Sequence, residues 1–316
     1  MQCKLSTILA VFIIITGFAV THAQSVLAQG YIPTRITKAI ELLENDQPIY
    51  YTQVNGGGYD EGKAMAQTWA DYITYNMEHS PFNTSELRAF MQGLVDGGPT
   101  KSGHRTPTVI AVLPFGGVNE AVMMANYWMV EQVLGAGVHG VLLAHARDPD
   151  VVEILVQSAR YPHTPYAEGL PEGLRGNGGQ GFAARIWGVS NQEYQRLAEP
   201  WPLNPGGEIL IGLKIEDRHA LENSEASTAV PGVGFAEWGP GDMRMSYDAD
   251  SGTAQILIDA RARVLAATKA AGIPFLNTVN THNIEAMIDE GVRIGANPGA
   301  EVADQGRRYT NRRMPW

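Results

Sequence analysis

The chain has 316 residues, of which 44% are hydrophobic, and it carries a formal net charge of −10 at pH 7. A chain this acidic does not bind nucleic acid through its overall field. Its single cysteine, Cys3, falls within an N-terminal leader, so the mature chain is expected to lack disulfides. A domain of this length can instead bury a core large enough for stability.

The N-terminus has the order of a secretory signal peptide: Lys4, an apolar run from Ile8 to Val20, and then polar residues. Small residues predict cleavage after residue 23 or 28, and the apolar run is too short to remain as a membrane span. An uncleaved N-terminal anchor is the alternative. We therefore expect 1–28 to be removed from an exported protein, periplasmic or secreted and free of the membrane, whose single domain is 29–316.

Short β-type runs alternate with helix-like stretches along the chain. A spacing of 3.6 residues between apolar positions predicts helices at 121–134, 149–159, 254–271 and 283–290. Strands alternating with helices form parallel units, and eight such units close into a (β/α)8 TIM barrel. The alternative is an open doubly wound sheet, as in two-lobed exported binding proteins. The eight β-type runs are 48–54, 72–77, 108–113, 138–144, 208–215, 232–238, 274–279 and 292–295.

Three segments do not follow this alternation. The stretch 161–207 is rich in glycine, proline and aromatic residues, which predicts a long loop with short helices on the catalytic face. The tail 303–316 contains four arginines and is expected to form an extended arm on a neighbouring subunit, with a frayed terminus as the alternative. The glycine run 55–58 lacks the spacing of a nucleotide-binding loop and is interpreted as a flexible loop at the barrel mouth.

Two carboxylates follow adjacent predicted strands. Glu216 comes directly after 208–215, and Asp242 comes shortly after 232–238. In a TIM barrel the functional residues gather where strands end, so these side chains are expected to converge. Two carboxylates on neighbouring strands can share one hard cation. The spacing alone also fits a helix cap at Glu216 and a turn residue at Asp242.

Two histidines also follow predicted strands. His79 comes directly after the second strand and could act as a general acid or base at the mouth, or be a structural histidine. Glu78 beside it suits a supporting partner or a helix cap. His145 follows the fourth strand and could line the mouth, although a buried structural histidine fits the sequence as well.

Five strings in this chain occur in the order seen in the HpcH/HpaI aldolase/citrate lyase family, which the chain resembles from about residue 35 to 300. The resemblance implies a barrel of the phosphoenolpyruvate/pyruvate type and a class II, metal-dependent aldolase. Such an enzyme cleaves or forms 4-hydroxy-2-oxo acids through a metal-bound pyruvate enolate. The strings are 77–81 (MEHSP), 159–162 (ARYP), 173–176 (GLRG), 214–217 (KIED) and 231–243, which runs from PGVG to GPGDM.

The resemblance also implies roles for single residues. Glu216 and Asp242 match the family's metal ligands, and His79 matches its acid/base histidine. Mg²⁺ or Mn²⁺ is expected, and Zn²⁺ or Co²⁺ could substitute. The implied partners are a small 2-oxo acid and further copies of the chain, as a homo-oligomer of hexamer or trimer-of-dimers type. The residues expected to bind substrate are Gly239, Gly241, Asp242, Arg175 and His145.

The chain departs from the family at two positions. The family usually has an aspartate three residues before the histidine, where this chain has Asn76, so His79 should be a weaker base. The family's third-strand arginine is absent from 108–113, and Arg105 is one candidate to replace it. Two other hypotheses therefore remain: a metal-enolate enzyme with a different lyase or hydrolase reaction, and an exported carboxylate-binding protein without catalysis.

Overall fold

The computed structural model of the chain describes residues 31–162, 171–250, 252, 254–296 and 298–316. The predicted signal peptide lies outside these residues. The strands are β1 (Ile49–Val54), β2 (Tyr72–Asn76), β3 (Thr108–Gly116), β4 (Gly140–Ala144), β5 (Pro200–Trp201), β6 (Ile209–Ile215), β7 (Phe235–Trp238), β8 (Phe275–Thr278) and β9 (Val292–Ala296).

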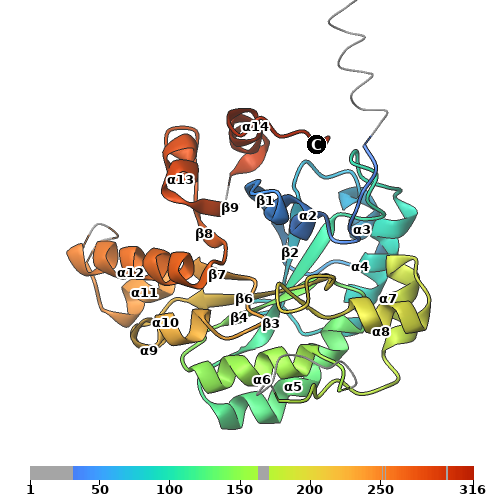
Figure 1. Cartoon of the computed structure of the whole chain (residues 1–316), viewed down its shortest axis with the longest axis horizontal. Coiled ribbons are helices and arrows are strands. Elements are labelled where there is room, and N and C mark those ends of the chain that lie inside the picture. The colour runs from blue at the N-terminus through green and yellow to red at the C-terminus, as the bar shows by residue number, and fades with distance from the viewer. Residues whose placement is uncertain (1–30, 163–170, 251, 253, 297) are drawn as a thin grey trace, which may run out of the picture.

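The helices surround these strands, as Figure 1 shows. They are α2 (Lys38–Glu44), α3 (Tyr59–Met65), α4 (Thr84–Asp96), α5 (Glu120–Leu134), α6 (Pro149–Ala159), α7 (Gln180–Trp187), α8 (Asn191–Leu197), α9 (Arg218–Glu222), α10 (Ser224–Thr228), α11 (Pro240–Ser246), α12 (Gln255–Ala271), α13 (Ile284–Glu290) and α14 (Gly299–Tyr309). No helix in this described part of the chain is both long and apolar enough to cross a bilayer.

The strands form one closed parallel barrel. The order is β4-β3-β2-β1-β9-β8-β7-β6, and pairing of β4 with β6 closes the ring. The two-residue strand β5 pairs beside the start of β6. Each of the eight predicted runs overlaps one barrel strand, so the (β/α)8 prediction is confirmed. The four predicted helices are also present, as α5, α6, α12 and α13, with ends that differ by at most one residue.

Helix α2 closes the N-terminal end of the barrel. Its residues Ala39, Ile40 and Leu42 are at most 1% exposed and share one apolar cluster with interior residues of several barrel strands. The backbone N–H of Ala39 donates to Oγ1 of Thr108 at the start of β3. Because this end is plugged, only the C-terminal end of the barrel is left to form a mouth.

The described residues between α6 and β6 lie at this closed N-terminal end. The ring of Trp187 in α7 stacks on His139, just before β4, with ring centroids 5.7 Å apart. Arg105, just before β3, donates through Nε to the carbonyl oxygen of Ile186. The prediction that 161–207 covers the catalytic face is therefore wrong for its described part. A connection from a helix to the next strand must reach the N-terminal end of that strand, opposite the mouth.

The C-terminal tail folds back on its own barrel. The guanidinium groups of Arg307 and Arg312 lie 3.2 and 2.8 Å from Oδ1 of Asp71, directly before β2. Met314 is 4% exposed and packs in the apolar cluster of α2. The tail is thus neither an extended arm nor a frayed end, because buried charge pairs and apolar packing hold it. Its contact with a neighbouring subunit stays a prediction.

Asp71 is the common partner of three buried cations, since the ammonium group of Lys38 also lies 3.1 Å from its Oδ1. Burial alone would raise the pKa of Asp71, but the charges of Arg312, Lys38 and Arg307 outweigh burial and hold that pKa well below its usual range. The carboxylate therefore contributes stability above the ordinary carboxyl pKa of about 4, and this contribution is lost as the pH falls further.

We expect Asp71→Asn to lower the free energy of unfolding by about 3–5 kcal/mol at pH 7, because it leaves buried cations without a counter-charge. Asp46→Asn is the matched control, since Asp46 is 79% exposed in its pair with Arg293 and such surface pairs contribute about 1 kcal/mol or less. Urea unfolding of both variants measures the difference. Equal losses would show that the Asp71 cluster does not anchor the tail.

Candidate functional site

Charged side chains of β6, β7 and the loop after β2 line a cavity at the open mouth of the barrel. The cavity has a volume of about 110 Å³, and its lining includes Glu78, His79, Lys214 and Glu237. A volume of about 30 Å³ per water molecule makes this room for a small molecule or a few waters. Aromatic and aliphatic residues of the barrel interior, such as Tyr72 and Leu142, form its floor.

Lys214 is the only positively charged residue lining this cavity within the described part of the chain. Its Nζ donates to Oε2 of Glu78 and lies 3.8 Å from Oε2 of Glu216. Burial would lower the pKa of Lys214, but the charges of Glu216, Glu237 and Glu78 outweigh burial, and the pKa is raised. The side chain therefore remains an ammonium ion inside an acidic cluster.

The acidic groups around Lys214 outnumber it. Burial raises the pKa of Glu237 to about 7, against the opposing charge of Lys214. Burial also raises the pKa of Glu216, which is 2% exposed. Asp242 contributes further negative charge to this group from the first turn of α11. Such a cluster favours an additional cation, because one ammonium ion does not neutralise several buried carboxylates.

Glu216 is held close to the neighbouring strand end. A Cβ atom at Gly239 would lie 2.4 Å from Cβ of Glu216 and 2.9 Å from its Oε2. Only glycine therefore fits at the end of β7 without moving this carboxylate. The role of Gly239 seen here is to make room for Glu216, while its predicted contact with substrate is a separate proposal.

A histidine–aspartate pair lies beside Glu216. Nδ1 of His145 is 2.9 Å from Oδ2 of Asp217, so the ring donates to this carboxylate, and the backbone N–H of His145 donates to Oε1 of Glu216. Arg147 also donates to Oδ2 of Asp217. His145 has φ of 50°, an unusual left-handed conformation for this residue type. The hydrogen bond to Asp217, followed by the charge of Glu216, raises the pKa of His145.

The donor atoms at the mouth suit a divalent cation. Glu78, His145 and Glu216 each offer one ligand atom, and these atoms all lie within 4.8 Å of one another. The two carboxylates suit a hard cation such as Mg²⁺ or Mn²⁺, and an imidazole nitrogen suits Zn²⁺. Asp242 does not belong to this group of three, but its charge acts on His145. Glu216 thus belongs to a group of side chains that could hold a metal ion. That Glu216 and Asp242 together bind the ion stays a prediction.

His79 and Asn76 are not arranged as an acid/base pair. The side chain of His79 is 71% exposed, and its Nε2 lies 3.7 Å from Oε1 of Glu78. Oδ1 of Asn76 accepts from the backbone N–H groups of Glu78 and His79. Asn76 therefore holds the backbone of this loop, and no described contact joins its amide to the imidazole.

Arg175 does not reach the mouth. Its side chain is buried, and Nη2 donates 2.7 Å to the hydroxyl group of Tyr194 in α8, at the N-terminal end of the barrel. Arg105 is likewise bound to a carbonyl oxygen at that end. The expectation that these arginines meet a substrate at the mouth is not supported, because both lie in segments that lead into strands. The glycines 56 and 57, by contrast, follow β1 on the mouth side, as expected.

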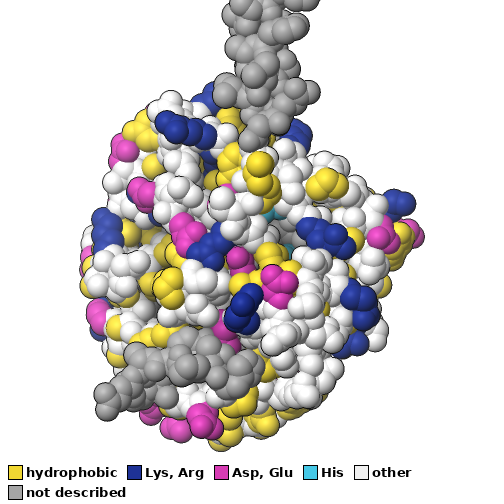
Figure 2. Space-filling view, turned by 45° about the vertical axis from the view of Figure 1, so that its right-hand side comes forward, with side chains coloured by type: hydrophobic (Ala, Val, Ile, Leu, Met, Phe, Trp, Pro, Cys, Tyr) yellow, Lys and Arg dark blue, Asp and Glu magenta, His cyan; other side chains and the backbone are white. Residues whose placement is uncertain are grey.

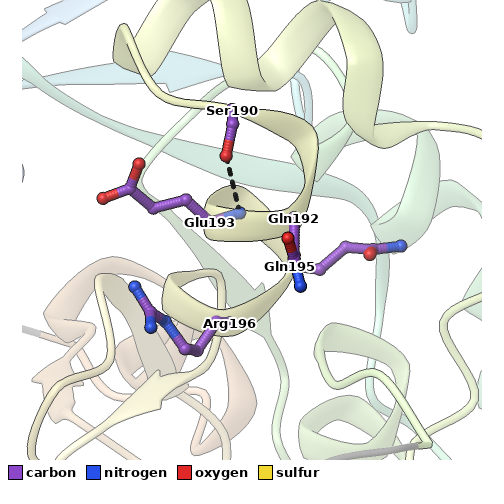
Figure 3. Close-up of a pocket in the computed structure, with 5 residues that line it drawn as sticks. All are labelled: Ser190, Gln192, Glu193, Gln195 and Arg196. Carbon is purple, nitrogen blue, oxygen red and sulfur yellow. Dashed lines mark hydrogen bonds between the residues drawn. The ribbon is translucent and has the colours of Figure 1, made fainter.

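A larger hollow than the mouth cavity lies elsewhere in the described part of the chain. It has a volume of about 680 Å³ and is lined from residues 190–196. In Figure 3 its side chains fan out from α8 in different directions, and Oγ of Ser190 accepts from the backbone N–H of Glu193 as the helix cap. The volume of a hollow therefore does not identify the functional site in this protein. On the face in Figure 2, acidic and basic side chains are interspersed.

Sequence reasoning missed Lys214 and Glu237 as site residues, although a signal was present. Side chains alternate along a strand, so Lys214 faces the same side of β6 as Glu216, and Glu237 faces the same side of β7 as the buried Phe235. A charged residue at an inward position of a barrel strand indicates a functional site. The Asp217 partner of His145 was also missed, because it comes from a different strand end.

Known proteins resemble this chain over most of its length. A hydroxypyruvate/pyruvate aldolase of Deinococcus radiodurans is 31% identical over 64% of this chain and 63% of the relative. The crystal structure of an HpcH/HpaI aldolase/citrate lyase family protein from Burkholderia cenocepacia has the same fold. Its TM-score is 0.66, with 22% identity over 86% of this chain and 96% of that one. The citrate lyase β subunit of M. tuberculosis, solved with oxaloacetate and magnesium, has a TM-score of 0.50 and 12% identity over 85% of this chain and 98% of that one.

The chain spans less than two thirds of the length of the first curated relatives that it matches. The model of the HpcH/HpaI aldolase/citrate lyase family, however, matches residues 63–301, which include every barrel strand after β1. The charged cluster at the mouth, from Glu78 to Asp242, falls within this match. The chain belongs to the HpcH/HpaI aldolase/citrate lyase family.

Proposed function

We propose that this protein is an aldolase-type lyase that cleaves or forms the carbon–carbon bond of small 4-hydroxy-2-oxo acids. The observation that carries the proposal is the convergence of Glu78, His145, Lys214 and Glu216 at the mouth of the barrel. The names of the curated relatives, pyruvate aldolases, favour a 2-oxo acid. The small cavity also suits a compact substrate.

We further propose that the enzyme is of class II, with Mg²⁺ or Mn²⁺ held by Glu216 together with Glu78 or Asp242. When bound, such a cation supplies Lewis-acid polarisation of the substrate carbonyl group. The magnesium bound by the citrate lyase β subunit supports a hard cation. The affinity for the metal ion is expected to be modest, because the ammonium group of Lys214 already pairs with Glu78 in the acidic cluster.

His145 is proposed to transfer the proton of the reaction. In the cleavage direction a base takes the proton of the substrate's 4-hydroxyl group, the C3–C4 bond breaks, and an aldehyde leaves. The electron pair stays with the 2-oxo acid fragment, which then takes a proton at C3. Asp217 holds Nδ1 of His145 and supports its protonated form. At the ends of β4 and β6, Asp217 thus gives His145 a negatively charged partner. Asn76 has no charge with which to support His79 in this way.

Lys214 is proposed to stabilise negative charge on the 2-oxo acid fragment. Its ammonium group lines the cavity and remains protonated, and a fixed donor in a water-poor site stabilises a developing oxyanion. It would thus replace the arginine missing from β3. The absence of this arginine also favours a second candidate function. It is a related lyase or hydrolase reaction with a different leaving group. Gly241 and the backbone N–H of Asp242 remain proposed contacts of the substrate carboxylate.

Export to the periplasm or medium and assembly as a homo-oligomer are also proposals. The first rests on the sequence of residues 1–28 and the second on family resemblance. Size-exclusion chromatography with light scattering on the mature chain tests the assembly directly.

We expect pyruvate release when the protein and Mn²⁺ are incubated with a panel of 4-hydroxy-2-oxo acids. Coupled detection of pyruvate measures turnover, and chelator-treated protein is the control. If no member of the panel releases pyruvate while pyruvate still binds the protein, the aldolase reaction is wrong and the second candidate gains support.

We expect Lys214→Met to bind Mn²⁺ at least about tenfold more tightly, a difference of about 1.4 kcal/mol, because a competing cation is removed from Glu78 and Glu216. Lys214→Arg, which keeps the charge, is the control and should bind much as the unmodified protein does. Glu216→Gln should lose Mn²⁺ retention while circular dichroism remains unchanged. Electron paramagnetic resonance counts free Mn²⁺, and an unchanged affinity in Lys214→Met would contradict this view of the cluster.

We expect His145→Asn to lower kcat by about 10²–10⁴, the usual contribution of a general acid or base. Asparagine tolerates the left-handed backbone of this position, so the fold should survive. His79→Asn is the comparison and should have the smaller effect, since His79 is largely exposed. Mn²⁺ affinity measured in parallel separates proton transfer from metal binding. A larger loss of kcat in His79→Asn than in His145→Asn would indicate that His79, after β2, is the acid/base residue.

A further inference from the structure

A second polar pocket lies on the outside of the barrel, away from the mouth. It is formed by α4, the C-terminal end of α5 and the loop that leads into α7, and its volume is about 220 Å³. Two arginines and one glutamate line it together with several glycines. The lining residues are Arg88, Glu131, Gln132, Gly135, Arg175 and 176–179.

Arg175 brings an unpartnered donor to this pocket. Its side chain is 3% exposed and lies against the rings of Tyr161 and Tyr194, at 4.7 and 5.2 Å from their centroids. Nη2 donates to the Tyr194 hydroxyl group, but Nη1 is buried and has no hydrogen-bond partner among the residues described. An unsatisfied buried donor on a charged group is costly, so this atom favours a ligand that accepts its proton.

Arg88, which lines the same pocket, also has a buried donor without a partner within the described ranges. Its guanidinium group lies over the ring of Phe182, 5.4 Å from the centroid. Nε of Arg88 is buried and, in the described part of the chain, has no hydrogen-bond partner. Two guanidinium groups that each retain a free donor therefore line one pocket, in a chain whose net charge is strongly negative.

The glycine loop leaves room for a ligand to approach the backbone. A Cβ atom at Gly176, Gly178 or Gly179 would meet no atom within 4 Å, so packing does not require glycine at these positions. Gly178 has φ of 133°, a conformation that other residues avoid. The loop ends at Gly179, the N-cap of the eight-residue helix α7, where free backbone N–H groups favour an anion.

Glu131 decides which anion fits. Its Oε1 accepts from the backbone N–H of Gly176 at 3.3 Å, so a carboxylate shares the pocket with the two arginines. A purely accepting anion, such as sulfate, would be repelled by this oxygen. A phosphate group that keeps one proton can donate its O–H to Glu131 while its other oxygens accept from Arg88 and Arg175.

We propose that this pocket binds a phosphate group, as inorganic phosphate or a phosphate monoester, separately from the lyase site. The arginines supply the positive charge, the glycine loop admits the phosphate oxygens, and Glu131 selects for the protonated form. The pocket contacts neither the cavity at the mouth nor its charged cluster. Phosphate bound there is positioned to act on α4, α5 and α7 together rather than to take part in the reaction.

The test is calorimetric titration of the metal-free protein with inorganic phosphate at constant ionic strength. Saturable binding is expected, and Arg88→Gln should weaken it about tenfold or more, the loss expected for one charge-assisted hydrogen bond. Arg185→Gln is the matched control, because Arg185 lies over the same Phe182 ring at 5.4 Å but does not line the pocket. Binding in this control should change about twofold at most.

Sulfate tests the role of Glu131, and glycerol phosphate tests the source of the phosphate. Sulfate should bind about tenfold more weakly than phosphate, a difference that Glu131→Gln should reduce. Tighter binding of glycerol phosphate would indicate a phosphorylated metabolite, and tighter binding of inorganic phosphate a free ion; either supports the site. No saturable binding, equal losses in Arg88→Gln and Arg185→Gln, or equal affinity for sulfate would overturn the proposal.

Discussion

The closed parallel barrel is the constraint on which the rest of this structure depends. Because all eight strands run in the same direction, every strand ends at the mouth and every strand begins at the opposite end, which α2 plugs. Inward positions of neighbouring strands then face one another across a narrow interior. Glu216 and His145 thereby come together from β6 and β4, although 71 residues separate them in the chain.

Both ends of the barrel contain buried charges, but the balance between them differs. At the plugged end one carboxylate, Asp71, faces Lys38, Arg307 and Arg312, and the excess of positive charge lowers its pKa. At the mouth Lys214 faces several carboxylates, and the pKa of Glu237 is raised to about 7. The first cluster is closed by the tail and serves stability. The second borders a cavity, where perturbed carboxyl groups favour ligand binding.

The fold could be predicted almost entirely from the sequence, because a recurring β-type run and a 3.6-residue helical period are local signals. The carboxylate Glu216 could also be placed, since a strand end identifies it. To predict Lys214 as a site residue, one must know which residues of β6 point into the barrel. The alternation of side chains along a strand gives this only when the strand register is known. The end of the barrel at which Arg175 lies does not follow from the sequence, because no local pattern identifies its loop as part of a helix-to-strand connection. The pairing of His145 with Asp217 depends on the closure of β4 against β6, which no local pattern shows.

The proposed proton-transferring group illustrates how one chemical requirement can be met on different strands. An imidazole acts as a stronger base when a carboxylate supports its protonated form. After β2, Asn76 binds the loop backbone instead of the imidazole, and the largely exposed His79 ring is 3.7 Å from Glu78, beyond hydrogen-bond distance. At β4 the same arrangement is complete, because Asp217 accepts from Nδ1 of His145 beside Glu216. The barrel brings both positions to the same mouth, because β2 and β4 end on the same side, so an acid/base group can be placed at either strand end while the acidic cluster at β6 stays in place.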